Sequence, residues 1–344
     1  MMQIGSAQAE AGQRAFGHIE VGETLSRIPV AIPVNVVNGS GDGPTLAVTA
    51  AMHGPELVGS VAIGRLLREL APAALKGQLI AVPVVNTSAF EFNQRATFWD
   101  GKDLNRQGRG NPEGSITERL ARAYFDHIVR QADYLIDIHS GGPDSYYYYT
   151  IYLSEVPGVA LNPAVVRTSR EMALAFGLEH IFAKTPWRGT LKDEAMKAGV
   201  PSITIEMGGG ADFFRNGAAQ VETCVRGITN VMKYLGMLDG EIRVESSRCT
   251  LWDAHTEITA GSASGFMMRQ THWGDVLQTG DTYAIVYHPY TGEEVARITA
   301  PRAGTVLNSG TVWPAIPPGR WLAVLGDLLE EVELEYAVVS QGDA

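Results

Sequence analysis

The stretch Thr45-Leu-Ala-Val-Thr-Ala-Ala-Met-His53-Gly-Pro-Glu56 determines the fold predicted for this chain. Its first eight residues, 45–52, form a near-continuous apolar run of strand length, which is typical of a buried strand in a parallel sheet. Apolar residues recur at helical spacing after Pro55, and proline suits the first turn of a helix. His53 and Glu56 are therefore expected where a strand ends and a helix begins, which is where open α/β sheets bind ligands.

Strand-like and helix-like segments alternate on both sides of this stretch. The expected strands are residues 28–37, 45–52, 78–85, 134–139 and 202–206. The expected helices are residues 56–70, 117–131, 163–177 and 216–236, and a long polar loop spans residues 86–115. The two prolines of the first strand favour an edge position for it. The alternation predicts an α/β fold whose mixed, mostly parallel central sheet has helices on both faces.

The last hundred residues have a different pattern. Short β-like runs separated by glycines follow one another, and no amphipathic helix of useful length interrupts them. We therefore predict a boundary within residues 238–248. It separates a catalytic α/β domain of residues 1–240 from a small, all-β C-terminal domain of residues 245–344, resembling a barrel or a sandwich.

The composition excludes several classes of protein. With 344 residues, 45% of them apolar and 19% charged, the chain is typical of a globular protein and of neither a disordered nor a membrane protein. A formal net charge of -11 argues against nucleic-acid binding, because polyanions would be repelled. No signal peptide and no membrane-spanning segment is recognisable, so we expect no membrane partner and a cytoplasmic location. Homo-oligomerisation is left open.

Two further strand ends repeat the arrangement of the opening stretch. His139 closes the strand of residues 134–139 and Glu206 closes the strand of residues 202–206, and glycines follow each of them within three residues. Packing alone does not explain an ionisable residue at the end of an apolar strand, although a single histidine is as readily a hydrogen-bonded core residue. Together with His53 and Glu56 they predict a zinc site with three protein ligands, an open position for water and a nearby carboxylate.

The long loop contributes positive charge. Arg95 lies in its first third, and the sequence Asp103-Leu-Asn-Arg106 follows. A guanidinium group can polarise a carbonyl oxygen or hold a carboxylate through two parallel hydrogen bonds. A solvated surface role remains the alternative for either arginine.

Four separated motifs resemble those of the succinylglutamate desuccinylase/aspartoacylase family, a branch of the zinc carboxypeptidase superfamily. In chain order they are His53-Gly-Pro-Glu56, Asp103-Leu-Asn-Arg106, Asp137-Ile-His139-Ser and Ile205-Glu206-Met-Gly-Gly. The resemblance covers about residues 30–240, and the β-rich tail is similar to the C-terminal domain of many members. It implies that His53, Glu56 and His139 bind one zinc ion per chain and that Glu206 is the general base.

The same resemblance implies roles for the long loop. Arg95 matches the arginine that polarises the scissile carbonyl group. Asn105 and Arg106 match the pair that binds a carboxylate of the substrate. Asp103 would orient the imidazole of His53, which fixes the tautomer of a metal ligand.

The chain departs from the family pattern at three places. Pro55 stands where members usually have Asn or Asp, and Gln107-Gly-Arg109-Gly follows Arg106 in place of an aromatic-Pro-Gly sequence. The run Tyr146-Tyr-Tyr-Tyr149 after His139 is also unlike the relatives, and its simplest interpretation is an aromatic-rich strand. The last two departures lie beside the predicted pocket, so the identity of the substrate does not carry over.

Three functions compete on this basis. The first is a zinc-dependent amidohydrolase that deacylates a small N-acyl amino acid or a related carboxylate. The second is a zinc carboxypeptidase that acts on peptides, which a wide groove would favour and a small pocket capped by the β domain would exclude. The third is a non-catalytic member that acts through its β domain, which conflicts with an intact set of site residues.

Overall fold

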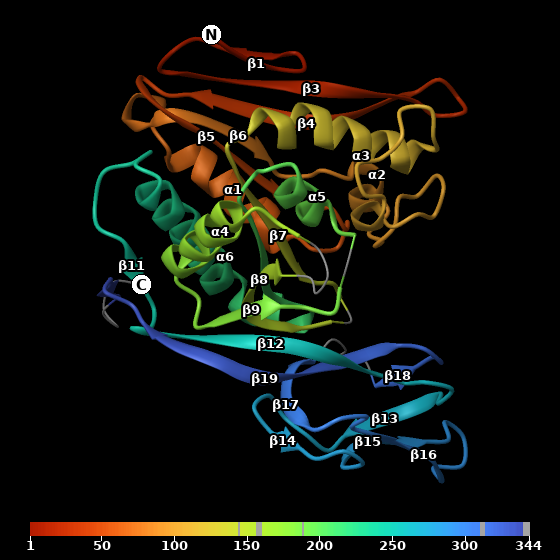
Figure 1. The fold of residues 1–344 in the computed structure, drawn as a ribbon. Helices are drawn as coiled ribbons and strands as arrows, with labels where there is room; N and C mark the ends of the chain where they lie inside the picture. Colours follow the sequence, from red (N-terminus) through yellow and green to blue (C-terminus); the bar gives the residue numbers. More distant parts are fainter. Residues whose placement is uncertain (144, 156–159, 188, 310–313, 340–344) are drawn as a thin grey trace.

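A twelve-stranded sheet runs through the whole molecule (Figure 1). The structure is a computed structural model that describes residues 1–143, 145–155, 160–187, 189–309 and 314–339. In spatial order the strands are β14 (Val276–Leu277), β17 (Gly304–Ser309), β19 (Trp321–Glu333), β12 (Arg248–Thr259), β9 (His180–Lys184), β8 (Tyr147–Glu155), β10 (Ser202–Gly209), β7 (Tyr134–Gly141), β5 (Gly41–Ala50), β6 (Lys76–Val82), β4 (Pro29–Asn38) and β3 (Gln13–Glu23).

The prediction of a mostly parallel sheet is wrong. Strands β10, β7, β5 and β6 are parallel neighbours, as are β8, β9 and β12, but six of the eleven neighbouring pairs described are antiparallel. The Tyr-rich segment forms β8, which begins only six residues after β7 ends and runs antiparallel to β10. So short a connection cannot carry the chain back to start a parallel strand. Strands at both ends of the sheet, β3 with β4 and the tail strands, add the other antiparallel pairs.

Helices cover both faces of the sheet. Helices α1 (Val58–Glu69), α4 (Pro163–Phe176) and α6 (Ala211–Tyr234) pack on one face, and α3 (Ile116–His127) and α5 (Leu191–Lys197) on the other. The side chains of β5 alternate accordingly: Leu46 and Val48 join the first core, whereas Ala47 joins the second. Among the described helices none is long and apolar enough to cross a membrane.

The strand expected at an edge is not an edge strand. Strand β4 lies between β3 and β6, because the first residues of the chain add β3 and the small hairpin of β1 (Met2–Ile4) and β2 (Ala7–Ala9). Its prolines nevertheless follow the physical rule that predicted an edge. Pro29 and Pro33 pair with β3, whereas β6 pairs with residues 35–38 of β4, so the prolines lie outside the two-sided part of the ladder.

The long loop and the helix ends contain short helices. Residues 86–115 include α2 (Thr87–Glu91) and the 3-10 turn η2 (Leu104–Arg106), and η1 (Pro72–Ala74) and η3 (Val129–Gln131) follow α1 and α3. A polar loop of this length inside a compact domain is uncommon unless it has its own structure or a function. Here it has both, because its turns bring several side chains to the site described below.

The tail is built from strands in the residues that the structure describes. Beyond β12, β14, β17 and β19 it forms a four-stranded sheet of β16 (Glu294–Thr299), β15 (Thr282–Tyr287), β13 (Gly265–Arg269) and β18 (Ala315–Ile316), and β11 (Arg243–Val244) pairs with β20 (Ala337–Val338). It has a core of its own around Tyr283, Val286 and Leu325. Strand β12 pairs in parallel with β9, so backbone hydrogen bonds join the tail to the central sheet.

Candidate metal centre and active site

A tight turn after β5 brings His53 and Glu56 together. Ala51 has a positive φ of 49°, a conformation that costs a non-glycine residue about 1–2 kcal/mol and that ends the strand abruptly. The backbone N–H of Glu56 donates to the carbonyl oxygen of His53 at 3.2 Å, which closes the turn. Helix α1 begins only at Val58, so Pro55 lies in this turn and not in the first helical turn as expected.

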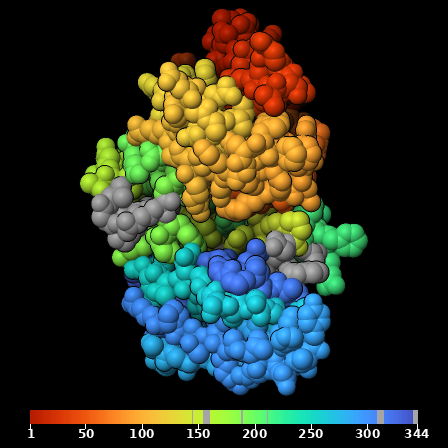
Figure 2. Space-filling view, turned by 90° about the vertical axis from the view of Figure 1, so that its right-hand side faces the viewer, coloured from red at the N-terminus to blue at the C-terminus, as the bar shows by residue number. Residues whose placement is uncertain are grey.

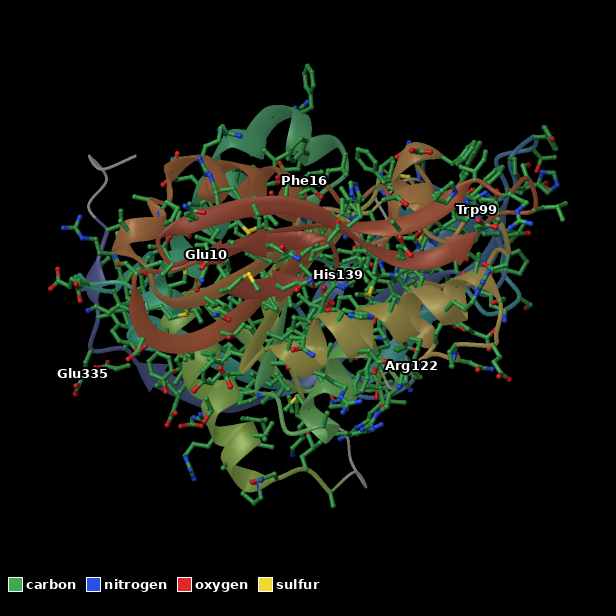
Figure 3. All side chains as sticks on the ribbon, turned by 90° about the horizontal axis from the view of Figure 1, so that it is seen from above. Glu10, Phe16, Trp99, Arg122, His139 and Glu335 are labelled. Atoms are coloured by element: carbon green, nitrogen blue, oxygen red, sulfur yellow. The ribbon has the colours of Figure 1, made fainter. Side chains whose placement is uncertain are left out.

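His53, Glu56 and His139 converge on one point. The Nδ1 atom of His53 lies 2.8 Å from Oε1 of Glu56, and Nδ1 of His139 lies 2.8 Å from Oε2 of the same carboxylate. The ligand atoms of the three residues lie within 4.8 Å of one another, and their exposed fractions are 2%, 6% and 3%. His139 is labelled near the middle of the molecule in Figure 3. The arrangement could hold a metal ion.

The outer nitrogens of the two imidazoles are held by carboxylates. Nε2 of His53 donates to Oδ1 of Asp103 at 3.1 Å, and Nε2 of His139 donates to Oδ2 of Asp137 at 2.9 Å. Thr49 in turn donates to the other oxygen of Asp137 at 2.8 Å. A carboxylate behind each imidazole fixes the tautomer whose Nδ1 lone pair faces the common centre, which is the state that binds a metal. The donor set therefore fits a divalent cation with nitrogen and oxygen ligands.

Electrostatics at this point favour a cation. Burial alone would raise the pKa of Glu56, but the neighbouring imidazoles of His53 and His139 outweigh it and hold the pKa well below its usual value. Burial would lower the pKa of His139, but Asp137 and Glu56 outweigh it and hold that pKa well above its usual value. The cluster thus stabilises positive charge at the point where the three side chains meet.

Glu206 lies beside the cluster without a partner. It is the register partner of His139 on the neighbouring parallel strand, and its Oε2 atom is buried with no hydrogen-bond partner among the described residues. Burial raises its pKa to about 8, with the charge of Glu56 adding to the rise and that of His139 opposing it. A cation held by Glu56 and His139 would lower this pKa again. Glu206 therefore places an ionisable carboxyl group, with one oxygen atom unpartnered among the described residues, beside the cluster.

The first part of the long loop positions Arg95. Asn86 is fully buried, caps α2 by accepting a hydrogen bond from the backbone of Ala89, and donates to the hydroxyl of Thr97 at 3.0 Å. Beyond α2, Arg95 reaches Oδ2 of Asp103 with Nε at 3.1 Å and Nη2 at 3.0 Å. Its Nη1 lies 3.6 Å from Oε1 of Glu56. Asp103 therefore connects the guanidinium group of Arg95 to the imidazole of His53.

The second part of the loop positions Asn105 and Arg106. Oδ1 of Asn105 accepts a hydrogen bond from the backbone of Leu191 at 2.9 Å, which ties the loop to α5 and leaves the side-chain amide nitrogen for a ligand. Arg106 donates from Nη1 to the carbonyl oxygen of Asn105 at 2.9 Å. Both side chains line the same cavity as His53 and Glu206.

This cavity has a volume of about 780 Å³, within the roughly 300–1,000 Å³ typical of small-molecule sites. In Figure 2 the surface is hollowed between the orange residues of the long loop and the cyan-to-blue tail. The tail supplies one wall of the cavity through Glu257, Thr259, Arg320 and Trp321. The rim predicted from the strand ends is therefore one side of a pocket whose opposite wall comes from the tail.

Several lining residues were not predicted from the sequence. Asp137, which lies behind His139 and not in the cavity lining, was not predicted either, although it had a usable signal: it lies two residues before His139 and so on the same face of β7. Tyr147 from the Tyr-rich run lines the cavity, and burial together with the charges of Glu206 and Glu56 raises its pKa. Trp187 and the tail residues carry no local signal, since only long-range strand pairing brings them to the cavity.

Comparisons with known proteins give one consistent result. A sequence profile described as the succinylglutamate desuccinylase/aspartoacylase catalytic domain matches residues 42–235. The chain is 29% identical over 320 residues to N-alpha-acetyl-L-2,4-diaminobutyric acid deacetylase from Halomonas elongata, covering 88% of this chain and 87% of that protein.

Solved structures share the fold over nearly the whole length. The product-bound ectoine utilization protein EutE (DoeB) from Ruegeria pomeroyi superposes with a TM-score of 0.79 at 25% identity, covering 93% of this chain and 98% of that chain. A succinylglutamate desuccinylase/aspartoacylase from Rhodobacter sphaeroides gives a TM-score of 0.79 at 24% identity, covering 92% and 96%. The similarity therefore includes the tail as well as the α/β part.

Proposed function

Since this chain belongs to the succinylglutamate desuccinylase/aspartoacylase family, we propose that it is a zinc-dependent amidohydrolase that deacylates a small N-acyl amino acid or a related carboxylate. One observation carries the proposal. The His53, Glu56 and His139 cluster and the unpartnered carboxylate of Glu206 lie on the same cavity, which is of small-molecule size. The relative from Halomonas elongata, named as a deacetylase of an acetylated diamino acid, supports the same reaction class.

The metal would be held by two imidazole nitrogens and one carboxylate, the ligand set of many catalytic zinc sites. When bound, zinc supplies a Lewis acid that activates water at neutral pH. Asp103 and Asp137 keep the two imidazoles in the binding tautomer through the hydrogen bonds to their Nε2 atoms. One zinc ion per chain is expected.

Glu206 would act as the general base and then as the general acid. Its Oε2 atom is buried and has no hydrogen-bond partner among the described residues, so it can take the proton from the attacking water. It can then return the proton to the leaving amine. A buried polar atom without a hydrogen bond lowers the stability of the fold. The fact that Oε2 has no partner among the described residues therefore supports a role in the reaction.

The two arginines would act on different parts of the substrate. Arg95 lies next to Glu56, so its guanidinium group can face the scissile carbonyl and stabilise the negative charge that develops on its oxygen. Arg106 and the free amide nitrogen of Asn105 can hold a carboxylate of the substrate in the ground state and in the transition state alike.

The shape of the cavity supports this function against the two alternatives. A peptidase with long substrates needs an open groove, whereas tail residues close one side of this cavity. A purely structural role for the catalytic part would not explain seven site residues brought to one cavity from three strand ends and a long loop.

The direct test is a screen of the purified, zinc-loaded protein for amine release. The substrates are acetyl, succinyl and formyl amino acids beside short peptides with free carboxyl ends. We expect turnover of acyl amino acids with a free α-carboxylate and little release from peptides. Turnover of peptides alone would favour the carboxypeptidase, and no turnover of either group with zinc bound would contradict both.

Separate roles for the arginines predict different kinetic changes. Arg106→Ala should raise KM with little change in kcat, because the lost contact stabilises the bound substrate and the transition state equally. Arg95→Ala should lower kcat by about 10²–10³-fold, as removal of an oxyanion donor does. Arg106→Lys should restore little of the substrate affinity, because lysine keeps the charge but cannot form two parallel hydrogen bonds to a carboxylate.

Two controls belong to this comparison. Zinc content must be measured in Arg95→Ala, because Arg95 also bonds to Asp103 and so contacts the partner of His53. Methyl esters of the substrates remove the carboxylate: wild type should strongly prefer the free acid, and Arg106→Ala should lose that preference. An undiminished preference in Arg106→Ala would mean that another group binds the carboxylate.

A further inference from the structure

We propose that Glu257, together with Trp187 and Trp321, forms a subsite that selects substrates carrying a positively charged amino group. The subsite belongs to the cavity of the proposed deacylase, so the inference rests on that function and specifies its substrate class. The three residues come from different parts of the chain. Trp187 follows β9, Glu257 lies on β12 and Trp321 begins β19, and all three line the cavity.

The carboxylate of Glu257 is oriented by an indole. Nε1 of Trp187 donates to Oε1 of Glu257 at 2.6 Å, across 70 residues of sequence. This bond uses one oxygen and leaves the second one for a ligand. Glu257 is exposed, but the bond from Trp187 holds its carboxylate in place at the cavity wall, so less entropy is lost when a ligand binds.

Aromatic rings line the same wall of the cavity as Trp187, the hydrogen-bond donor to Glu257. The ring centroids of Trp187 and Trp321 are 6.2 Å apart with planes at 68°, and Tyr152 lies 5.1 Å from Trp187. Tyr147 continues the series at 5.9 Å from Trp321. Ring faces attract cations through their quadrupole, and indole is the strongest of the natural rings in this respect. A carboxylate combined with indole faces is the chemistry that recognises an ammonium group.

Two polar atoms on the same side of the cavity have no partner among the described residues. The hydroxyl of Thr185, whose residue is 3% exposed, and Nε1 of Trp321 are buried without a hydrogen bond. Both residues line the cavity. Buried groups of this kind are usually satisfied. The hydroxyl of Thr185 can accept a hydrogen bond from an ammonium group, whereas the indole N–H of Trp321 only donates and so suits an oxygen atom of the substrate.

Charged groups of both signs line the cavity, and Glu257 is the carboxylate among the described residues of its tail wall. Arg95 and Arg106 lie with the metal ligands, whereas the tail wall carries Glu257. Arg320 also lines the tail wall, but its guanidinium group is directed to the hydroxyl of Ser145 at 3.4 Å. A substrate with a carboxylate and a second, protonated amine therefore fits in one orientation, with the carboxylate on Arg106 and the ammonium group on Glu257.

The test compares two substrates of equal length. Nα-acetylornithine and Nα-acetylnorleucine differ only in an ammonium group or a methyl group at the end of the side chain. For the zinc-loaded wild type we expect kcat/KM to favour the charged substrate by about tenfold or more. Glu257→Gln should remove most of that preference, with the loss in KM for the charged substrate. Glu257→Lys should shift the preference toward Nα-acetylglutamate.

A matched control is available in the same domain. Glu331 is an exposed carboxylate of β19 that does not line the cavity, so Glu331→Gln makes the same charge change and should keep the wild-type preference. Equal use of both substrates by the wild type, or an unchanged preference in Glu257→Gln, would overturn the inference while the deacylase function stands.

A binding measurement separates this failure from that of the deacylase function. Calorimetry of the zinc-loaded protein with ornithine and with norleucine reports the subsite without turnover. Tighter binding of ornithine that Glu257→Gln abolishes would support the subsite even if no acyl amino acid were hydrolysed. Equal binding of the two amino acids would overturn it.

Discussion

Glu206→Gln is expected to keep the fold and the bound zinc and to lower kcat by about 10²–10⁴-fold. Glutamine has nearly the same shape as glutamate but cannot accept a proton, so the substitution removes the base and leaves the packing of β10 intact. The partner-free Oε2 atom makes the substitution mild for stability, because no hydrogen bond is broken. The measurements are steady-state kinetics on a hydrolysed acyl amino acid, elemental analysis and thermal unfolding.

Asp212→Asn provides a comparison for this variant. Asp212 is an acidic residue in the first turn of α6, just beyond β10, and it is outside the lining of the cavity. The Asp212→Asn variant should retain a kcat close to that of the wild type. If Glu206→Gln released zinc and kept its activity per bound metal, Glu206 would be a ligand and the base would have to be another residue.

His53→Ala and His139→Ala should each lose zinc. Loss of a residue that only orients a ligand weakens a metal site by about 10–100-fold, so removal of a ligand should lower the affinity at least as much. Activity should fall with the metal, and added zinc should restore little of it. The site also loses an imidazole that balances Glu56, so we expect lower thermal stability of the metal-free variants. Elemental analysis and a competition titration with a chelator measure the effect.

His272→Ala serves as the control for zinc loss. His272 is a largely exposed histidine of the tail, far in sequence from the ligand cluster, and it pairs loosely with Asp275 at 3.8 Å. It should retain one zinc ion per chain. Full metal in both His53→Ala and His139→Ala would end the assignment of these residues as ligands.

The sequence predicted the parts of the molecule that depend on local patterns. The apolar runs of β5, β7 and β10 and the periodicity of α1 and α3 are local, and so are the ionisable residues that close the strands. Four motifs in order predicted the family, and the match to residues 42–235 confirms it. The structure also brings His53, Glu56 and His139 together, because parallel strands end at the same edge of the sheet.

The errors concern strand direction and long-range pairing. A run such as Tyr147–Glu155 has the composition of a strand, but nothing within it specifies which neighbour it pairs with or in which direction. The same holds for β12, whose pairing with β9 joins segments 70 residues apart, from His180 to Thr250. The tail wall of the cavity depends on this pairing, so Glu257 could not be assigned to the site from sequence alone.

The pairing of β9 with β12 also limits how the protein can move. Because the tail continues the central sheet, it cannot swing open as a rigid lid without breaking backbone hydrogen bonds of β12. For protein engineering, a tail exchanged between relatives has to bring its own β12 in register with β9, and it would carry Glu257 and Trp321 to the cavity but not Trp187, which would have to be exchanged with it.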